Sequence, residues 1–228
     1  MAKKKLFKYQ LISPSLPVGG FCYSEGMESF LKRKKLDDHN AIKDLIVDEL
    51  NFGQIRIDSK SLLDFVDLYK CLHSSNHCLK YKYRIISLNK WLIALRDSKE
   101  IRDQQRQMAR SLLDLSKNLG FEFPFQLEKN ISWPLAWSWL SFCSEIDRKE
   151  MVENFIFSWT ANQLSAAIRL IPMGSTKAQI IQYELLDKIS NLASEIIKKD
   201  LNEIYISNIS LSMAQQSHGE LYTKLFRN

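Results

Sequence analysis

The stretch DHNAIKDLIVDELNFGQI, residues 38–55, carries the pattern that decides the fold class. Its apolar side chains at Ile42, Leu45, Ile46 and Leu50 recur at intervals of three and four residues. This interval places them on one face of an amphipathic helix, because a helix turns once in 3.6 residues. The spacing therefore predicts a helix with one buried face.

The same rhythm recurs along most of the chain, which contains only 7 glycines and 5 prolines in 228 residues. So few turn-forming residues disfavour a β-rich fold. The sequence predicts one all-α domain over residues 1–228, a helical bundle of roughly eight to ten helices. We expect a further helix that begins after Ser59 or Ser61, and one long helix or two in line between about Lys80 and Gly120. Two more helices are expected over residues 135–143 and 148–170. A last one follows Pro172–Gly174, where Thr176 and Gln179 have the spacing of a capping box.

The composition is that of a soluble globular protein, with 45% hydrophobic and 25% charged residues. The net charge of +6 comes from residues 1–35, which hold eight basic and two acidic side chains, whereas the rest of the chain is balanced. This charge is confined to a basic N-terminal tail of about residues 1–8 and to the run Lys32–Lys35, which favours a helix C-terminus. Because phosphate binding needs basic residues along one face, a nucleic-acid-binding module is the weaker alternative.

No apolar run approaches the length of a membrane span, and MAKKK is not followed by the apolar stretch of a signal peptide. We therefore expect a cytoplasmic protein that binds no membrane. The four cysteines are scattered through a chain large enough to fold without disulfides, so reduced thiols are expected.

One short cluster, Cys71, His73, His77 and Cys78, could hold a metal ion if both histidines lay on one helix face. The intervening Ser74–Asn76 favours a turn between helices, which would separate the two imidazoles. We therefore expect a solvated turn with no bound metal, and metal binding stays the alternative.

The run Leu16–Gly26 contains two adjacent glycines, which could cradle a phosphate before a helix. A following Gly-Lys-Ser/Thr and a preceding strand are both missing, so a nucleotide-binding loop is not expected. The glycines instead predict tight backbone bends, with Phe21 and Tyr23 anchoring the loop to the core. A nucleophilic Cys22 remains an alternative.

Three other segments are unusual for an ordinary helical bundle. Residues 95–108 are polar over nearly three helical turns, and their Arg and Gln side chains suit a protein interface as well as a solvated face. Arg169 lies near an expected helix C-terminus, where it can act as a cap. Residues 216–228 end in an apolar pair flanked by basic residues, which indicates a segment that becomes ordered against the core or against a partner.

Taken together, these features resemble the urease accessory protein F (UreF) family along nearly the whole chain. The chain departs from the usual family pattern at several positions, including Cys22 in place of serine and Ser132 in place of histidine. The segments that carry the resemblance are the run Leu16–Gly26, Glu100 and Arg102 with Arg106, Gln107 and Met108, the turn Ser165–Gly174, and His218 with Leu225–Arg227.

The resemblance implies a non-enzymatic homodimer without a cofactor. Such a chaperone binds the accessory protein UreD (also called UreH) and through it recruits the GTPase UreG. The complex docks on apo-urease and couples GTP hydrolysis to nickel insertion. A helical enzyme that uses Cys22 or His218 is the alternative reading.

The resemblance also implies where the partners bind. The C-terminal segment, about residues 210–228, would order against UreD/UreH, and the Gly19–Glu28 and Glu100–Met108 regions are candidate surfaces for the GTPase or the dimer. The candidate partner-binding residues are Gly19, Gly20, Phe21, Tyr23, Ser24, Glu25, Glu28, Glu100, Arg102, Arg106, Gln107, Arg169, His218, Tyr222, Leu225, Phe226 and Arg227.

Overall fold

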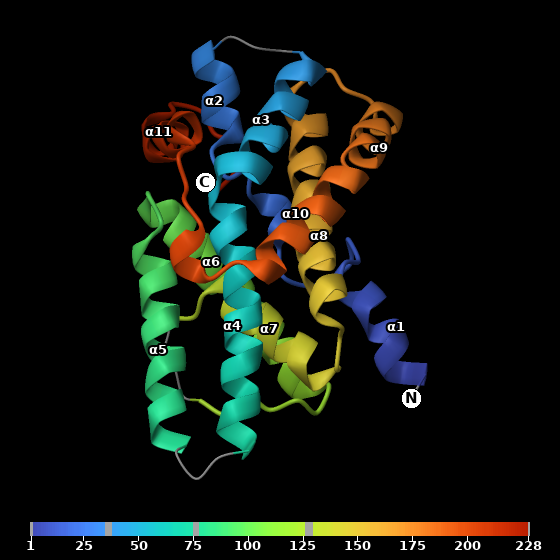
Figure 1. The fold of residues 1–228 in the computed structure, drawn as a ribbon. Helices are drawn as coiled ribbons and strands as arrows, with labels where there is room; N and C mark the ends of the chain where they lie inside the picture. The colour runs from blue at the N-terminus through green and yellow to red at the C-terminus, as the bar shows by residue number, and fades with distance from the viewer. Residues whose placement is uncertain (1, 35–37, 75–77, 126–129, 228) are drawn as a thin grey trace.

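A computed structural model describes residues 2–34, 38–74, 78–125 and 130–227, and all regular structure in them is helical (Figure 1). This confirms the all-α fold class. The helices are α1 (Ala2–Leu11), α2 (Met27–Lys34), α3 (His39–Phe52), α4 (Gln54–Ser74), α5 (Cys78–Ala94), α6 (Lys99–Asn118), α7 (Trp133–Cys143), α8 (Arg148–Leu170), α9 (Ser175–Glu184), α10 (Leu186–Lys198) and α11 (Ile209–Ser217), with 3-10 turns η1 (Gly20–Cys22), η2 (Leu201–Glu203) and η3 (His218–Glu220).

Helix α7 forms the centre of the core, as its aromatic composition predicts, and packs against α4 and α6. The Trp137 side chain is only 1% exposed, and its ring centre lies 5.5 Å from that of Phe155 in α8. Trp139 meets Tyr69 of α4 edge to face, with 5.4 Å between ring centres. The helix starts where the Ser132 hydroxyl accepts a hydrogen bond from a backbone amide.

Helix α4 begins earlier than the sequence analysis predicts. It follows α3 after Gly53 alone, and Ser59 and Ser61 are buried inside it instead of starting it. The Ser61 hydroxyl donates to the Ile57 carbonyl one turn back, so it needs no other partner in the core. Gly53 leaves room for the Glu49 carboxyl group, which would have to shift if a Cβ were present, because that Cβ would lie 2.1 Å from it.

Residues 80–120 form two helices, α5 and α6. The break is explained by Ser98, whose hydroxyl accepts a hydrogen bond from the Ile101 amide and so caps the start of α6. At the other end of α6, Gly120 takes a left-handed φ of 87°, as expected for a glycine that follows a helix.

The helix expected after Pro172–Gly174 is divided at Leu185 into α9 and α10. Its predicted inward face is correct, because Ile181, Leu185 and Ile189 are buried. The predicted capping box is wrong. The N-cap of α9 is Gly174, so Thr176 and Gln179 both lie inside the helix.

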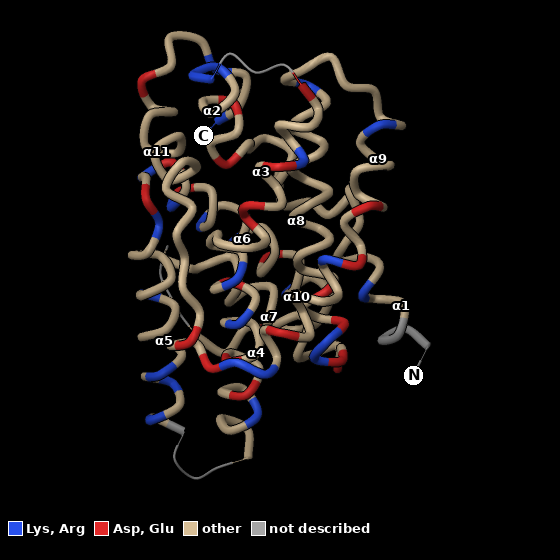
Figure 2. Tube along the Cα trace, turned by 45° about the horizontal axis from the view of Figure 1, so that its top comes forward, with Lys and Arg blue, Asp and Glu red and all other residues tan. Residues whose placement is uncertain are grey.

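The basic N-terminal residues belong to helix α1, which packs Phe7 and Leu11 into the core. The run Lys32–Lys34 ends α2, as predicted, while Lys35 lies outside the described residues. Acidic and basic residues are interspersed along the trace in Figure 2. None of the helices in the described part of the chain combines the length and apolarity that a bilayer span requires.

Candidate functional site

The C-terminal residues 221–227 follow η3 and lie against α2 and η1, and we call them the strap. The Glu28 carboxylate of α2 accepts hydrogen bonds from the backbone amides of Leu225 (2.9 Å) and Phe226 (3.1 Å). The Glu28 side chain is only 1% exposed, and Phe226 is 3% exposed. The strap is therefore fixed to the body of the protein by a buried anion and a buried ring.

Lys32 completes this anchor. Its ammonium group lies 2.8 Å from the Glu28 carboxylate and also donates to the Thr223 carbonyl at 2.8 Å. Burial by itself would raise the pKa of Glu28, but the hydrogen bonds from Lys32 and from the two strap amides lower that pKa below its ordinary value. Glu28 therefore stays ionised and keeps its hold on the strap.

Arg169, near the end of α8, connects three separate parts of the chain. Its guanidinium donates to the Ser165 carbonyl of its own helix at 3.2 Å, one turn back inside α8 and not among the exposed carbonyls at the helix end. The same group donates to the Phe21 carbonyl of η1 at 2.6 Å and lies 4.5 Å from the centre of the Phe226 ring. One cation thus holds the loop, the helix end and the strap together.

The loop between α1 and α2 bends as its glycines predict. Gly19 has a left-handed φ of 72°, and a Cβ on Gly20 would lie 3.1 Å from the Asn162 amide nitrogen of α8. Tyr23 is buried and anchors the loop, but Phe21 does not, because 60% of its surface is exposed. The loop therefore offers an aromatic side chain to the solvent beside the strap, where the Arg227 amide donates to the Cys22 carbonyl at 3.0 Å.

The next residues, Ser24 and Glu25, turn inward instead of lining the surface. Ser24 is fully buried. The Glu25 carboxylate accepts hydrogen bonds from the Gln104 amide of α6 (2.7 Å) and the Trp159 indole of α8 (2.8 Å). Burial raises the pKa of Glu25, although these two hydrogen bonds oppose the shift. This part of the predicted site therefore connects the loop to the core.

Helix α6 divides its predicted site residues between two environments. Its polar face includes buried Gln104 and Gln105, and the Gln105 side chain accepts from the Trp133 amide at the start of α7. Arg102 donates to the Arg96 carbonyl at 2.7 Å. The exposed remainder of the helix pairs locally: Arg106 with Asp103, and Gln107 with Arg110. Glu100, at the start of the helix, lies beside Gly219 of η3.

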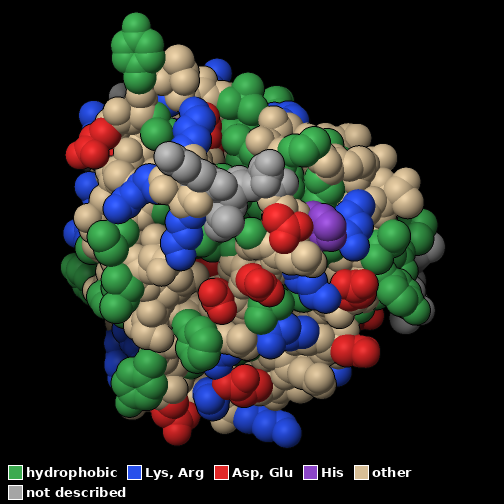
Figure 3. All heavy atoms as spheres, turned by 90° about the horizontal axis from the view of Figure 1, so that it is seen from above, with side chains coloured by type: hydrophobic (Ala, Val, Ile, Leu, Met, Phe, Trp, Pro, Cys, Tyr) green, Lys and Arg blue, Asp and Glu red, His purple; other side chains and the backbone are tan. Residues whose placement is uncertain are grey.

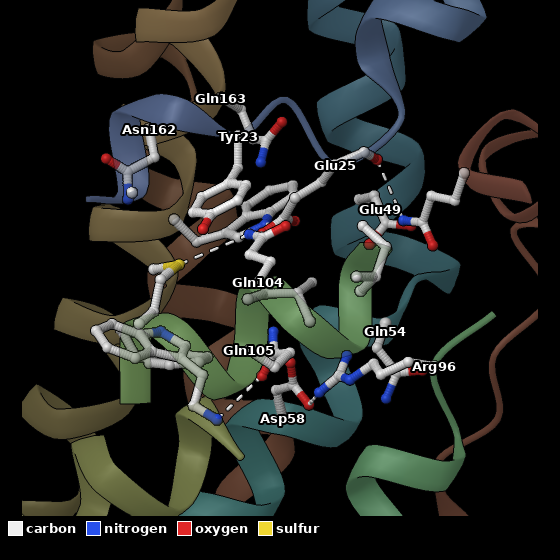
Figure 4. Close-up of a pocket in the computed structure, with 18 of the residues that line it drawn as sticks. Tyr23, Glu25, Glu49, Gln54, Asp58, Arg96, Gln104, Gln105, Asn162 and Gln163 are labelled. Carbon is white, nitrogen blue, oxygen red and sulfur yellow. Dashed lines mark hydrogen bonds and ion pairs between the residues drawn. The ribbon is translucent and has the colours of Figure 1, made fainter. Parts of the chain in front are cut away.

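A polar cavity of about 50 Å³ lies behind the loop (Figure 4). Three carboxyl groups, from Glu25, Glu49 and Asp58, line it together with the buried Arg96 guanidinium. Arg96 pairs with Asp58 at 2.5 Å, and Glu49 accepts a hydrogen bond from the Asn208 amide just before α11 at 3.0 Å. The cavity therefore joins α3, α4, α6 and the C-terminal region through buried charged and polar groups.

Burial controls the protonation of these acids. It raises the pKa of Glu49 to about 8, and the nearby Glu25 carboxylate adds to this shift by repulsion. It also raises the pKa of Asp58, although Arg96 opposes that shift. Sequence reasoning missed this cluster. A usable signal was present, since Glu49 follows Leu45 and Ile46 at helical spacing and so falls on the apolar face of α3.

Three predicted contact residues near the chain terminus, His218, Tyr222 and Leu225, differ in their exposure to solvent. His218 is 1% exposed, and neither ring nitrogen has a hydrogen-bond partner of good geometry among the described residues. Burial lowers its pKa, although the Glu28 carboxylate opposes the change. Tyr222 and Leu225, in contrast, point outward, with Leu225 60% exposed and Tyr222 fully exposed. Only these two of the three can contact another protein without rearrangement.

The expected cysteine and histidine cluster is only partly visible. His73 lies in the last turn of α4 and bonds through Nδ1 to the Tyr69 carbonyl at 2.8 Å. His77 lies outside the described residues. Among the described residues, no group of three or more His, Cys, Asp or Glu side chains is arranged to hold a metal ion.

The fold and the site define an all-α protein in which a loop, a helix end and the chain terminus form one surface. The family model described as UreF matches residues 36–186. Two urease accessory proteins UreF of Prochlorococcus marinus, from subspecies pastoris strain MED4 and strain MIT 9312, are 60% and 55% identical over the full length of both chains. A Picosynechococcus protein of the same name is 28% identical over 99% of this chain and all of its own. The chain belongs to the UreF family of urease accessory proteins.

Proposed function

We propose that this protein is a nickel-insertion chaperone that acts by binding other proteins. It joins the UreD/UreH accessory protein and the UreG GTPase on apo-urease, and it couples GTP hydrolysis to nickel incorporation. It has no catalytic role of its own, works in the cytoplasm and forms a homodimer. Membership of the UreF family supports this assignment.

The observation that carries the proposal is the surface formed by η1, Arg169 and the strap. It presents three side chains, Phe21, Tyr222 and Leu225, with exposed fractions of 60% or more. The backbones of Phe21 and Leu225 are held in place by Arg169 and Glu28, respectively. A rigid backbone below exposed aromatic and aliphatic side chains lowers the entropic cost of binding, which suits a protein interface.

The strap and the loop have separate parts in this proposal. We assign the strap to UreD/UreH, because Tyr222 and Leu225 are exposed next to the chain end. We assign the loop around Phe21 and the outer face of α6 near Arg106 and Gln107 to the GTPase or to the second protomer. Arg169 bonds to the loop and stacks on the strap. A partner that binds one of these two segments therefore changes the affinity of the other segment for its own partner.

The test mixes the purified chain with purified UreD/UreH and UreG from the same organism and measures complex formation by gel filtration at micromolar concentration. We expect a stable complex with the wild type. The double variant Tyr222→Ser, Leu225→Asp should weaken binding of UreD/UreH at least tenfold, because it removes two exposed apolar contacts. The control Tyr183→Ser changes an equally large exposed ring on α9 and should bind normally.

Failure of the wild type to form any complex would overturn the proposed function. Normal binding by the double variant would overturn the assignment of the strap. Both variants should keep wild-type melting temperatures, since exposed side chains contribute little to stability.

A further inference from the structure

A groove of about 220 Å³ lies between α2 and α11, and we call it the α2–α11 groove. Apolar side chains form part of its lining, and two cations lie along one side. In the view of Figure 3, Lys and Arg side chains gather beside hydrophobic ones next to the grey segment. The lining residues are Phe30, Arg33, Lys34, Ser210, Met213 and Ala214.

The two cations on the α2 side are available for a partner. Lys32, in the same helix turn, is occupied by Glu28. Arg33 donates to the Ser217 hydroxyl at 3.2 Å, and the Lys34 ammonium lies 4.9 Å from the centre of the Phe30 ring. Within the described part of the chain, neither Arg33 nor Lys34 forms an ion pair with a carboxylate. Both side chains are exposed, so their positive charges are accessible to a partner along the groove.

The α11 side is uncharged. Residues 204–217 contain no Asp, Glu, Lys or Arg, in a chain where a quarter of all residues are charged. Ile209 and Met213 lie one turn apart on α11 and are 69% and 51% exposed. Side chains four residues apart share a helix face, so the two form an apolar ridge along this side. A scarcity of charged residues together with exposed apolar side chains is typical of the core of a protein interface.

We propose that the α2–α11 groove binds an acidic amphipathic helix of a partner protein. An apolar residue of that helix enters the groove between Phe30 and Met213. Carboxylates on the flanking turn pair with Arg33 and Lys34. The groove is a second contact site, separate from the surface of the loop and strap, because none of Phe21, Tyr222 and Leu225 lines it. It rests on the proposed function only in expecting a protein partner.

Charge complementarity selects this occupant. A nucleic acid would need a series of basic residues along the groove, whereas one side here is the uncharged helix α11. A basic or neutral helix would leave Arg33 and Lys34 desolvated without a counter-charge, which disfavours it. An acidic helix with one apolar face satisfies both sides of the groove.

The test uses the full chain and a fluorescein-labelled peptide with Leu at i, i+3, i+4 and i+7 and Glu at the other positions. A second peptide has the same composition in scrambled order. Fluorescence anisotropy should show tighter binding of the amphipathic peptide, and its affinity should fall as salt rises. A photo-reactive version should cross-link within residues 30–34 or 209–214.

The double charge reversal Arg33→Glu, Lys34→Glu should weaken this binding about tenfold or more. Met213→Ser should weaken it without changing its salt dependence. The matched control Lys82→Glu, Arg84→Glu makes the same charge change on exposed positions of α5 and should bind as the wild type does. Circular dichroism checks that each variant is folded.

Equal binding of the two peptides, or unchanged binding by the double reversal, would overturn the proposal. So would a single-stranded oligonucleotide that binds these two cations more tightly than the peptide. A wild-type dimer that the double reversal converts to monomer would mean that a second copy occupies the groove, and would overturn it too. Because the probe contains no urease protein, these outcomes are independent of the complex tested above.

Discussion

The Arg169 guanidinium lies 4.5 Å from the centre of the Phe226 ring, although 56 positions separate the two residues in the sequence. The same guanidinium donates to the Phe21 carbonyl at 2.6 Å. The guanidinium therefore links the end of α8 to the loop between α1 and α2 and to the strap. Loop and strap are therefore parts of one surface, which the Arg169 side chain joins in addition to the Glu28 anchor.

Replacing Arg169 should loosen the loop and the strap together. In Arg169→Ala, the Phe21 carbonyl loses its donor and Phe226 loses its cation. We expect faster hydrogen exchange at the amides of Cys22 and Tyr23 in the loop and of Phe226 and Arg227 in the strap, measured by mass spectrometry or NMR. Arg169→Lys should rescue this only in part, because an ammonium group lacks the planar fork that bonds and stacks at once.

The control for this prediction is Arg110→Ala, which removes a guanidinium whose hydrogen bonds to described residues both lie within α6. Exchange in the strap should then stay at the wild-type rate. Faster exchange in the strap without any change in the loop would show that Arg169 does not couple the two.

Deleting residues 221–228 should lower the melting temperature. From the sequence alone, a terminal segment is expected to contribute little to stability. The structure predicts otherwise, because Phe226 is buried and the buried Glu28 carboxylate would lose two amide donors. Loss of about 2–3 kcal/mol corresponds to a fall of about 5–10 °C for a domain of this size.

Differential scanning calorimetry measures the effect of this deletion. Glu28→Gln in the full-length chain should lower the melting temperature in the same direction, since a neutral amide is a weaker acceptor than a carboxylate. A truncated chain with the melting temperature of the wild type would show that the strap does not contribute to the stability of the fold.

Glu49 makes stability depend on pH in the neutral range. Its pKa is about 8 in the folded protein, against about 4.3 for an unfolded chain. The folded state therefore binds the proton more tightly. The stabilisation that this proton on Glu49 gives the folded state is fully present below about pH 4 and is lost as pH rises toward 8. The free energy of unfolding should fall over this range by at most about 1.4 kcal/mol per pH unit.

Urea unfolding at a series of pH values between 5 and 8 tests this dependence. Glu49→Gln, which keeps an acceptor for Asn208 but cannot ionise, should flatten the profile. Glu122→Gln changes an exposed acid and should leave the profile as it is in the wild type. Parallel wild-type and Glu49→Gln profiles would contradict the prediction.

The pair Asp58 and Arg96 should be costly to break from one side. Arg96→Met leaves a buried carboxylate without its partner, so we expect a loss of about 3–5 kcal/mol in the free energy of unfolding. The double variant Asp58→Leu, Arg96→Met should recover much of this loss, because no buried charge remains. A loss of less than about 1 kcal/mol in Arg96→Met would show that water reaches Asp58.

Much of the fold could be predicted because helix periodicity is local. The inward positions of α3 and α10 follow from the spacing of apolar residues alone, and the central place of α7 follows from its aromatic composition. Predictions of helix ends were less successful. Ser59 and Ser61 have the residue type that starts a helix, but their hydroxyl groups are buried inside α4. Whether a serine caps a helix or fills its interior depends on neighbours that the local sequence does not contain.

The sequence names candidate residues in the loop, at the end of α8 and in the strap, and only the structure shows how they are arranged. Sequence reasoning found Phe21, Arg169 and Phe226 as unusual residues, and the structure joins them. It also expected His218 to be part of the contact surface, whereas the strap and the body of the protein bury this side chain. The cavity acids were overlooked. An acidic residue such as Glu49 is recognised as buried only when its position is compared with the helical spacing of the apolar residues around it.

The amino-acid sequence by itself determined that this protein is all-helical, which faces of its helices are buried, and which four segments set it apart. These properties follow from interactions between residues within a few turns of each other. Only the tertiary structure decided that Glu28 holds the strap, that Arg169 bridges the loop and the terminus, and that Glu49 and Asp58 share a cavity. Each of these features depends on burial and on contacts between groups far apart in the chain. The spacing of neighbouring residues in the sequence determines neither the burial nor the contacts.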